Sequence, residues 1–174
     1  VRTILGEKGF KIAFTGNIGR AQGLDLLPKT ARYLNDVDVK FVIVGDGRYQ
    51  GELEREIRSC RVTDQFVMIP RQAAERIPEI LAVCDIAFLS FREADLFEKT
   101  IPAKLQSYMA CGKPILAAAR GETKRIIEEA QCGICCCMGD AEACAEAIRE
   151  LMKEDLGKMG RNGREYCEKH FGKN

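Results

Sequence analysis

The sequence predicts one α/β domain with a parallel β-sheet of about six strands and helices on both faces. Short apolar runs of strand length alternate with longer segments of helical period along the whole chain. One of these runs, VKFVIV at 39–44, is almost continuously apolar, as is typical of a strand covered on both faces. The connections are short, and repeated βα units with short connections build a parallel sheet.

Each element follows from this alternation. We expect strands at residues 11–15, 39–44, 66–69, 86–90, 115–119 and 133–137. We expect helices at about 23–34, 50–60, 73–83, 103–110, 122–130, 141–153 and 156–170. Gly112 and Pro114 give the helix at 103–110 a clear end. Ligands bind such sheets at the carboxyl ends of the strands, so the loops after strands one, two, four and five are the candidates.

Length and composition fit one globular domain, which we place at residues 1–174. Hydrophobic residues make up 46% of the chain and charged residues 30%. Lys and Arg number 27 against 26 Asp and Glu, so the chain lacks the basic excess of a nucleic-acid-binding domain. Its apolar runs are far shorter than the roughly 20 residues that cross a bilayer. The chain begins with Val1, which suggests a piece of a longer protein.

Nine cysteines allow two interpretations. Cys132 and Cys135 have the C-x-x-C spacing of a zinc site, but a structural zinc usually needs a second pair of ligands. The alternative is a buried strand at 133–137 in which cysteine serves as a small apolar residue. We expect the second, with reduced thiols, no metal and a cytoplasmic location.

The turn TGNIGRAQG at 15–23 directly follows the first strand and opens a helix. Glycines let the backbone approach a ligand closely, and helix N-termini present free N–H groups to phosphate. Arg20 adds a cation that can hydrogen-bond a phosphate. A plain glycine-rich turn is the alternative.

A nicotinamide-binding site is a further alternative. The pattern G-x-G-x-x-G is absent, although the spacing of Gly16, Gly19 and Gly23 resembles the turn of short-chain dehydrogenases. No Tyr-x-x-x-Lys pair follows, and Asp46 stands farther from the turn than the usual acidic residue.

A second candidate segment is EKTIPAKLQ at 98–106. Glu98 can accept hydrogen bonds from sugar hydroxyls, and the amide of Gln106 can bond a diol. Pro102 marks the start of a helix, where Lys104 adds a cation to a second anion site. The alternative is a solvated loop with charged residues.

These segments together resemble retaining GT-B glycosyltransferases, family four in the usual grouping. AKLQSYMACGKPILA resembles the stretch E-A-M-A-x-G-x-P-V-I of that family, and CGICCCMGDAE resembles G-x-x-V-x-P-G-D-x-E. The segments GLDLL, FVIVGDG and AVCDIAFLS occur in the same order. The resemblance covers essentially the whole chain.

The resemblance implies half of a GT-B architecture, the C-terminal Rossmann-like domain that binds the nucleotide-sugar donor, with the N-terminal acceptor domain absent. The E-x7-E motif of the family would place its first Glu at Glu98, on the donor sugar, and its second at Gln106, on the ribose. Asn17 and Gln22 stand where the family has Arg and Lys, which leaves Arg20 as the stand-in. Arg71 follows the third strand, where the base is held.

We therefore expect Glu98 to be catalytic. The residues expected at the nucleotide sugar are Gly16, Asn17, Arg20, Gln22, Gly23, Arg71, Thr100, Ile101, Pro102, Lys104 and Gln106. The implied activity moves a hexose or N-acetylhexosamine from a UDP-sugar, without cofactor or metal, to a glycan or lipid-linked acceptor. Membrane contact would come only through the missing half, and no nucleic acid is expected as a partner. Half of a non-hydrolysing sugar-nucleotide epimerase and a non-catalytic nucleotide-binding module remain as alternatives.

Overall fold

A computed structural model describes residues 6, 8–92 and 103–172 of the chain, in which six parallel strands form one sheet. The strand order is β3-β2-β1-β4-β5-β6, that of the Rossmann fold. The strands are β1 (Phe10–Asn17), β2 (Val39–Asp46), β3 (Phe66–Ile69), β4 (Ile86–Ser90), β5 (Ile115–Ala118) and β6 (Gly133–Cys136). The expected parallel sheet is confirmed.

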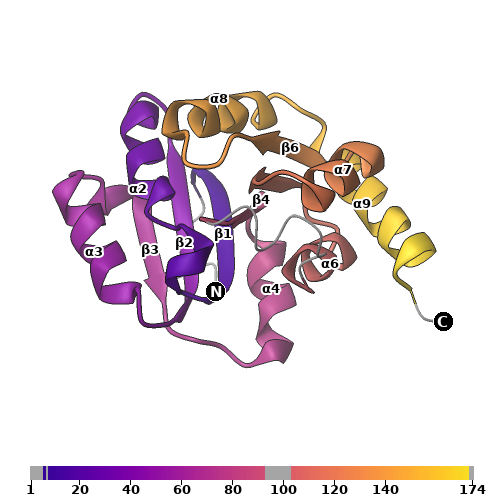
Figure 1. The fold of residues 1–174 in the computed structure, drawn as a ribbon, viewed down its shortest axis with the longest axis horizontal. Coiled ribbons are helices and arrows are strands. Elements are labelled where there is room, and N and C mark those ends of the chain that lie inside the picture. Colours follow the sequence, from indigo (N-terminus) through magenta and orange to yellow (C-terminus); the bar gives the residue numbers. More distant parts are fainter. Residues whose placement is uncertain (1–5, 7, 93–102, 173–174) are drawn as a thin grey trace.

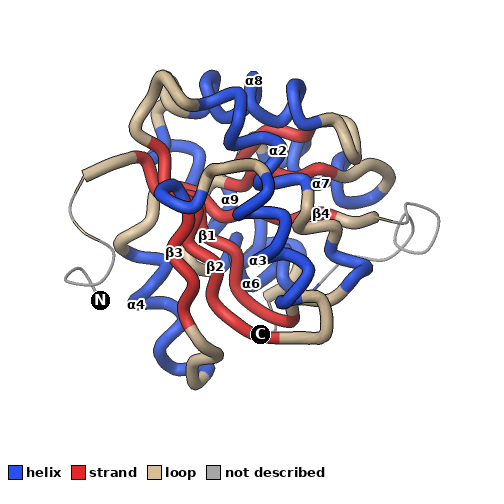
Figure 2. The backbone as a smooth tube through the Cα atoms, turned by 90° about the vertical axis from the view of Figure 1, so that its left-hand side faces the viewer, coloured by secondary structure: helices blue, strands red, loops and turns tan. Residues whose placement is uncertain are grey.

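Helices cover both faces of the sheet (Figure 1). One face carries α2 (Leu26–Ala31), α3 (Gln50–Ser59) and α8 (Ala141–Leu151). The other face carries α4 (Ile77–Ala82), α6 (Ala103–Ala110), α7 (Glu122–Ala130) and α9 (Leu156–His170). Figure 2 shows the twisted strands running between these two layers.

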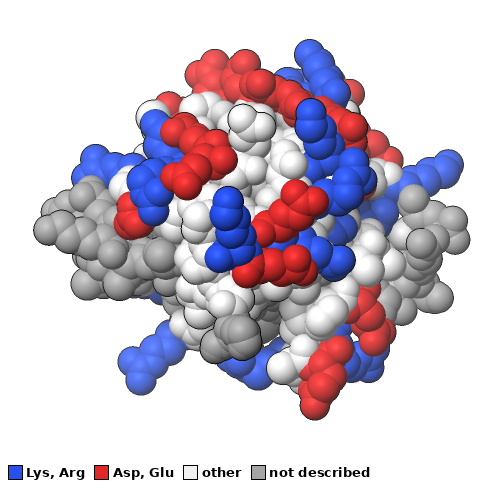
Figure 3. Space-filling model, turned by 90° about the vertical axis from the view of Figure 1, so that its right-hand side faces the viewer, with Lys and Arg blue, Asp and Glu red and all other residues white. Residues whose placement is uncertain are grey.

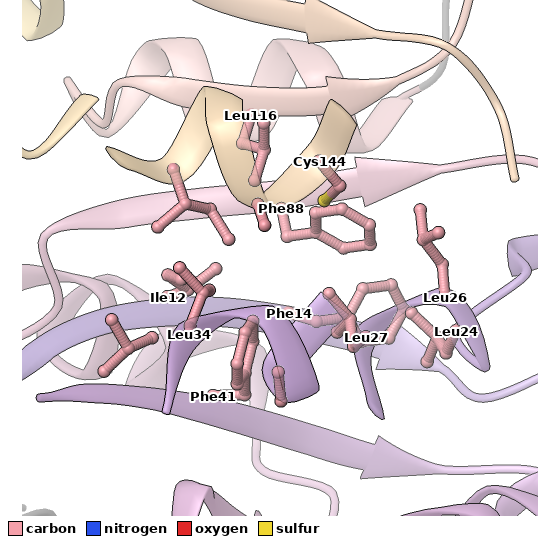
Figure 4. Close-up of a cluster of buried hydrophobic side chains, with 14 of the residues drawn as sticks. Ile12, Phe14, Leu24, Leu26, Leu27, Leu34, Phe41, Phe88, Leu116 and Cys144 are labelled. Carbon is pink, nitrogen blue, oxygen red and sulfur yellow. The ribbon is translucent and has the colours of Figure 1, made fainter. Parts of the chain in front are cut away.

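Two hydrophobic clusters, one on each face, hold the layers together. Side chains alternate between the faces along a strand, so Ile12 and Phe14 of β1 pack toward α2 and α8, whereas Ala13 packs toward α4 and α6. Figure 4 shows the first cluster, in which Phe88 and Cys144 complete the packing around Phe14. Burial of this apolar surface is the main force that stabilises the fold.

Two of the expected helices are broken into shorter pieces. The expected helix at 23–34 consists of α2 followed by a 3-10 turn, Arg32–Leu34, and a separate 3-10 turn, Arg20–Gln22, precedes it. Gly23 separates the first turn from α2, because it adopts a left-handed conformation with a φ of 58°. The expected helix at 73–83 likewise begins with a 3-10 turn, Ala74–Arg76, before α4.

All nine cysteines are free thiols in the structure. Cys135 packs with the α7 side of the sheet and Cys136 with the α8 side, as the alternation of a strand requires. Across residues 6, 8–92 and 103–172, no group of three or more His, Cys, Asp or Glu side chains is arranged to hold a metal ion.

On the face of the molecule shown in Figure 3, acidic and basic side chains are interspersed. This agrees with the near-equal totals of the two charge types in the sequence. Among the helices of the described residues, none combines the length and the apolar character that a membrane span requires.

Candidate functional site

The sheet opens between β1 and β4. β1 pairs with β2 along its whole length, from Phe10 to Asn17, but with β4 only through Ile12 and Ala13. From Phe14 onward, no pairing joins the two strands in the described residues. The strand order also reverses here, and open α/β sheets bind their ligands at this point of the carboxyl edge.

Lys104 of α6 reaches into this gap. The helix lies on the face of the sheet opposite to that of the Phe14 side chain. The Nζ atom of Lys104 nevertheless lies 3.9 Å from the centre of the Phe14 ring. A Cβ atom on Gly16 would stand 2.5 Å from the same Nζ, so the absence of a side chain at Gly16 makes room for the ammonium group. The Lys104 side chain therefore passes through the opening beyond the last β1–β4 pair.

The Lys104 ammonium group has no ion-pair partner among the described residues and lies against the Phe14 ring, beneath Gly16. Burial lowers its pKa to about 8, because the charged form loses part of its hydration. At neutral pH the group is still a cation. A partly buried cation at the carboxyl edge of a parallel sheet is suited to an anionic ligand.

The turn after β1 is held by its own side chains. The Oε1 atom of Gln22 accepts a hydrogen bond of 3.0 Å from the backbone N–H of Gly19. The Asn17 side chain lies between Gly19 and Gly47, whose added Cβ atoms would stand 2.7 Å and 2.8 Å from it. Asn17 and Gln22 therefore shape the turn in this structure.

Arg20 points away from Lys104 and toward α3. Its Nη2 atom lies 3.5 Å from Oε1 of Glu52, and its guanidinium group lies 5.8 Å from the centre of the Tyr49 ring. The Arg20 side chain is 70% exposed. With Asn17 and Arg48, these residues line a hollow of about 420 Å³ beside the turn. The structure thus places Arg20 at the expected turn but does not bring it to the Lys104 ammonium group.

Arg92, directly after β4, is a residue that sequence analysis missed. Its backbone N–H donates to the carbonyl of Ala21 at 2.8 Å, and its Nε donates to the carbonyl of Arg20 at 3.0 Å. Its Nη2 also donates to Oδ1 of Asp25 at 2.7 Å. Ser90 adds a hydrogen bond from its hydroxyl to the carbonyl of Gln22. These contacts fasten the end of β4 to the turn after β1. The position of Arg92 after the fourth strand was the only signal for it in the sequence.

Arg71 and Asp46 form an ion pair at the carboxyl ends of β3 and β2. The Nε and Nη2 atoms of Arg71 donate to Oδ1 of Asp46 at 3.0 Å and 2.7 Å. This pairing raises the pKa of the Arg71 guanidinium group. The acidic residue considered for a nicotinamide ribose is therefore already engaged by an arginine.

A larger hollow of about 840 Å³ lies at the carboxyl ends of β5 and β6. Its walls include the cationic residues Arg120 and Lys124 and the acidic residues Glu146 and Glu150. Because the charges are of both signs, this hollow does not single out one class of ligand.

Gln106 projects from α6 in a different direction from Lys104. Two residues along an α-helix correspond to a rotation of about 200°. The backbone carbonyl of Gln106 accepts a hydrogen bond from Sγ of Cys167 in α9 at 3.7 Å. Ser107, about 60° from Lys104 by the same rule, is exposed. The ribose contact of Gln106 therefore stays a prediction, and Ser107 lies nearer to Lys104 around the helix.

Four of the expected site residues lie outside the described part of the chain. They are Glu98, Thr100, Ile101 and Pro102. Gly16 and Asn17 end β1, and Arg20, Gln22 and Gly23 follow in the turn after it. Lys104 lies beneath Gly16.

Comparison with known proteins shows the family of the chain. The model of the family "Glycosyl transferases group 1" matches residues 2–170. The chain is 31% identical over 159 residues to the probable glycosyltransferase WbjE of Pseudomonas aeruginosa, covering 89% of this chain and 38% of that protein. It is 27% identical over 150 residues to N-acetyl-alpha-D-glucosaminyl L-malate synthase of Bacillus anthracis, covering 84% of this chain and 37% of that protein.

Solved structures share the fold. Anabaena Alr3699/HepE in complex with UDP matches with a TM-score of 0.85 and 20% identity, covering 98% of this chain and 47% of that one. The C-terminal domain of a glycosyl transferase group 1 family protein (LpcC) from Francisella tularensis matches with a TM-score of 0.77 and 17% identity, covering 95% and 87%.

The chain spans less than half the length of these curated relatives, and the family match covers nearly all of it. The sheet order and the helix arrangement are those of a GT-B half, as the sequence implied. The chain therefore belongs to the family of glycosyl transferases group 1.

Proposed function

We propose that this chain is the donor-binding domain of a retaining glycosyltransferase. The whole protein would move a hexose or N-acetylhexosamine from a UDP-sugar to a glycan or lipid-linked acceptor. The observation that carries the proposal is the Lys104 ammonium group, held under Gly16 in the gap between β1 and β4 without a carboxylate from the described residues. A nucleotide diphosphate supplies the negative charge that this site lacks.

The relatives support the choice of donor. Alr3699/HepE has been solved with UDP and with UDP-glucose, and its fold matches nearly the whole chain. The chain spans only about two fifths of the WbjE sequence. We propose that an N-terminal domain, which would hold the acceptor, accounts for the remainder.

The residues of the site receive distinct roles in this proposal. Lys104 binds the diphosphate from below the turn, and Arg20 approaches it from the outer side by a change of rotamer. These cations would stabilise the negative charge that develops on the departing diphosphate. Gly16 and Gly23 let the backbone approach the phosphates, and no metal or cofactor is required.

The remaining roles rest on the resemblance. Glu98 is proposed as the catalytic residue at the donor sugar, with Thr100, Ile101 and Pro102 near the phosphates. Arg71 is proposed to border the base. The ribose contact is assigned by sequence spacing to Gln106, and Ser107, which is exposed and lies about 60° from Lys104 around α6, is a competing candidate.

A titration of the 174-residue chain tests the proposal. Binding of UDP, UDP-glucose, UDP-N-acetylglucosamine, uridine and NAD would be followed by NMR or calorimetry. We expect dissociation constants of about 0.1–1 mM for the UDP compounds, because half of the cleft leaves much of the ligand in water. Uridine should bind more weakly, since it lacks the diphosphate.

Two outcomes would contradict the proposal. Saturable binding of NAD in preference to UDP would favour a dinucleotide-binding module. Conversion of a UDP-sugar to its epimer by the full-length protein, with no acceptor present, would favour the epimerase alternative. Transfer to an acceptor by the full-length protein, with the chain alone inactive, is the result that we expect.

A further inference from the structure

Tyr108 of α6 completes the hydrogen bonding of β1 where β4 departs. The backbone N–H of Thr15 donates to Oη of Tyr108 at 3.1 Å, and Oγ1 of Thr15 lies 3.3 Å from the same oxygen. Tyr108 is 1% exposed. Ala13 pairs with β4, and Thr15, two residues later, directs its N–H to the same side of β1. At Thr15, however, β4 no longer provides a partner.

This hydrogen bond has a counterpart at the other end of the short β1–β4 ladder. There the backbone N–H of Lys11 donates to Oδ2 of Asp85 at 2.8 Å. Side chains thus satisfy β1 on both sides of the two paired residues. A buried N–H group without a partner is costly, so the Tyr108 hydroxyl group stabilises the open end of the ladder.

Tyr108 lies one helical turn after Lys104, and residues at this spacing share a face of the helix. The contact between Thr15 and Tyr108 therefore fixes the face of α6 from which Lys104 projects. It sets how far the Lys104 side chain extends past β1. The same contact holds Nζ of Lys104 near Phe14 and beneath Gly16.

We propose that Tyr108 is a positioning residue for the donor diphosphate, acting through its hydrogen bond to Thr15 and the resulting placement of Lys104. The inference rests on the proposed function, because it assumes that Lys104 binds the diphosphate. Tyr108 itself is buried in the core cluster on the face of the sheet that α6 covers, so in this proposal it acts without touching the ligand.

The test compares Tyr108→Phe with Tyr166→Phe. Tyr166 of α9 also uses its hydroxyl group, which lies 3.2 Å from Oε2 of Glu129 in α7, far from the β1 turn along the sheet. Tyr108→Phe should weaken UDP binding about tenfold and uridine binding less than about twofold, because only UDP uses the ammonium group. Tyr166→Phe should leave both affinities unchanged.

A double-mutant cycle shows whether the effect passes through Lys104. In a Lys104→Met background, Tyr108→Phe should cause no further loss of UDP affinity. The inference is overturned if Tyr108→Phe weakens UDP and uridine binding equally, or weakens neither. It is also overturned if the loss of UDP affinity is as large in the Lys104→Met background as in the wild-type chain. If Tyr108→Phe does not fold, Thr15→Val replaces the Oγ1 partner of Tyr108 with a methyl group and keeps the backbone donor, so it should cause a smaller loss that is still selective for UDP. Equal losses for UDP and uridine, or no loss for either, would overturn the inference.

The wild-type chain separates this inference from the proposed function. If the wild-type chain binds no UDP, the proposed function fails. If it binds UDP and the variants show no UDP-selective loss, only the role of Tyr108 fails.

Discussion

The Lys104 ammonium group lies 3.9 Å from the centre of the Phe14 ring, although the helix that carries Lys104 covers the opposite face of the sheet. The side chain can reach this position only because β1 and β4 cease to pair after Ala13. A cation held in this way gains some energy from the aromatic ring. The ammonium group also loses hydration, which lowers the stability of the folded chain. An anion that binds there would compensate for this loss.

Lys104→Met should therefore have opposite effects on binding and on stability. We expect UDP affinity to fall by about 1.5–3 kcal/mol, the usual contribution of a hydrogen bond to a charged group. Uridine affinity should not change. Lys104 has no carboxylate partner in the part of the chain that the structure describes, so removal of this partly buried charge should leave the melting temperature equal or higher. Calorimetric titration and thermal unfolding measure the two effects.

Lys113 provides a matched control for this prediction. It is also a partly buried lysine, and burial lowers its pKa, but its Nζ donates to the carbonyl of Cys84 near the amino end of β4. Lys113→Met should lower stability and leave UDP binding intact. A loss of UDP affinity in Lys113→Met as large as that in Lys104→Met would argue against a specific role for Lys104.

UDP binding should also depend on pH through Lys104. Burial lowers the pKa of the Lys104 ammonium group to about 8, and a bound diphosphate should raise it again. Above pH 8, Lys104 should therefore take up a proton when UDP binds. UDP affinity at pH 9 should be about tenfold lower than at pH 7, because most Lys104 side chains are then uncharged before binding. The phosphate of the ligand ionises near pH 6, below this window. Calorimetry at both pH values, in buffers of different ionisation enthalpy, measures the affinity and the proton uptake.

The same shift has a defined sign for stability. The pKa of Lys104 is lowered in the folded chain from 10.5 to about 8, so the unfolded chain binds more protons between these values. This group therefore makes the folded chain more stable as the pH rises through that interval. Lys104→Met should remove the pH dependence of UDP affinity and that of stability. If either dependence persists in this variant, another group causes it.

Sequence patterns predicted most of the fold because each element has its own periodicity. The strand at 39–44 is apolar on both faces and is buried on both faces in the sheet. The start of the helix expected at 23–34 was misplaced, because Gly23 is left-handed, with a φ of 58°, and lies against the backbone of Arg92. That contact joins residues far apart in the sequence, and periodicity carries no information about it.

The site was predicted less completely, for the same reason. The glycine-rich turn and Lys104 were recognised separately, but the opening that brings them together depends on where β1 and β4 stop pairing. The local sequences of β1 and β4 do not show which of their residues pair or where the pairing ends. The role of Arg92 likewise depends on carbonyl groups of the turn after β1.

The cysteines should differ in reactivity toward a thiol reagent. Cys137 is exposed and should react first in the native chain. Cys132 and Cys84 should react slowly, because burial raises the pKa of each, to about 12 and about 11 respectively, and the thiolate is the reactive form. In denaturant without reductant, all nine should react. Stoichiometric zinc by elemental analysis, or missing thiols, would contradict this prediction.

Arg20→Ala should weaken UDP binding less than Lys104→Met does. The Arg20 side chain is 70% exposed and lies 3.5 Å from Glu52, so its charge is hydrated and partly neutralised. Such exposed pairs contribute about 0.2–1 kcal/mol. Glu52→Gln, which frees Arg20, should strengthen UDP binding by a similar small amount. If Arg20→Ala weakens uridine and UDP equally, the substitution acts through the turn and not through the diphosphate.

Gln106→Ala and Ser107→Ala decide between two assignments of the ribose contact. Counting the E-x7-E spacing from Glu98 gives Gln106, whereas matching E-A-M-A to S-Y-M-A gives Ser107. Ser107 is exposed and lies about 60° from Lys104 around α6, whereas Gln106 lies about 200° from it. We therefore expect Ser107→Ala to weaken UDP binding by about 0.5–1.5 kcal/mol and Gln106→Ala to have little effect.

A ribose analogue makes this comparison specific. A residue that hydrogen-bonds the 3′-hydroxyl of the ribose distinguishes UDP from 3′-deoxy-UDP, because the analogue leaves the polar group of that residue without a partner. Ser107→Ala should therefore reduce the preference for UDP over 3′-deoxy-UDP, and Gln106→Ala should retain it. The reverse result would restore the assignment to Gln106. In that case two residues of α6 about 200° apart around the helix, Lys104 and Gln106, would contact different parts of the nucleotide.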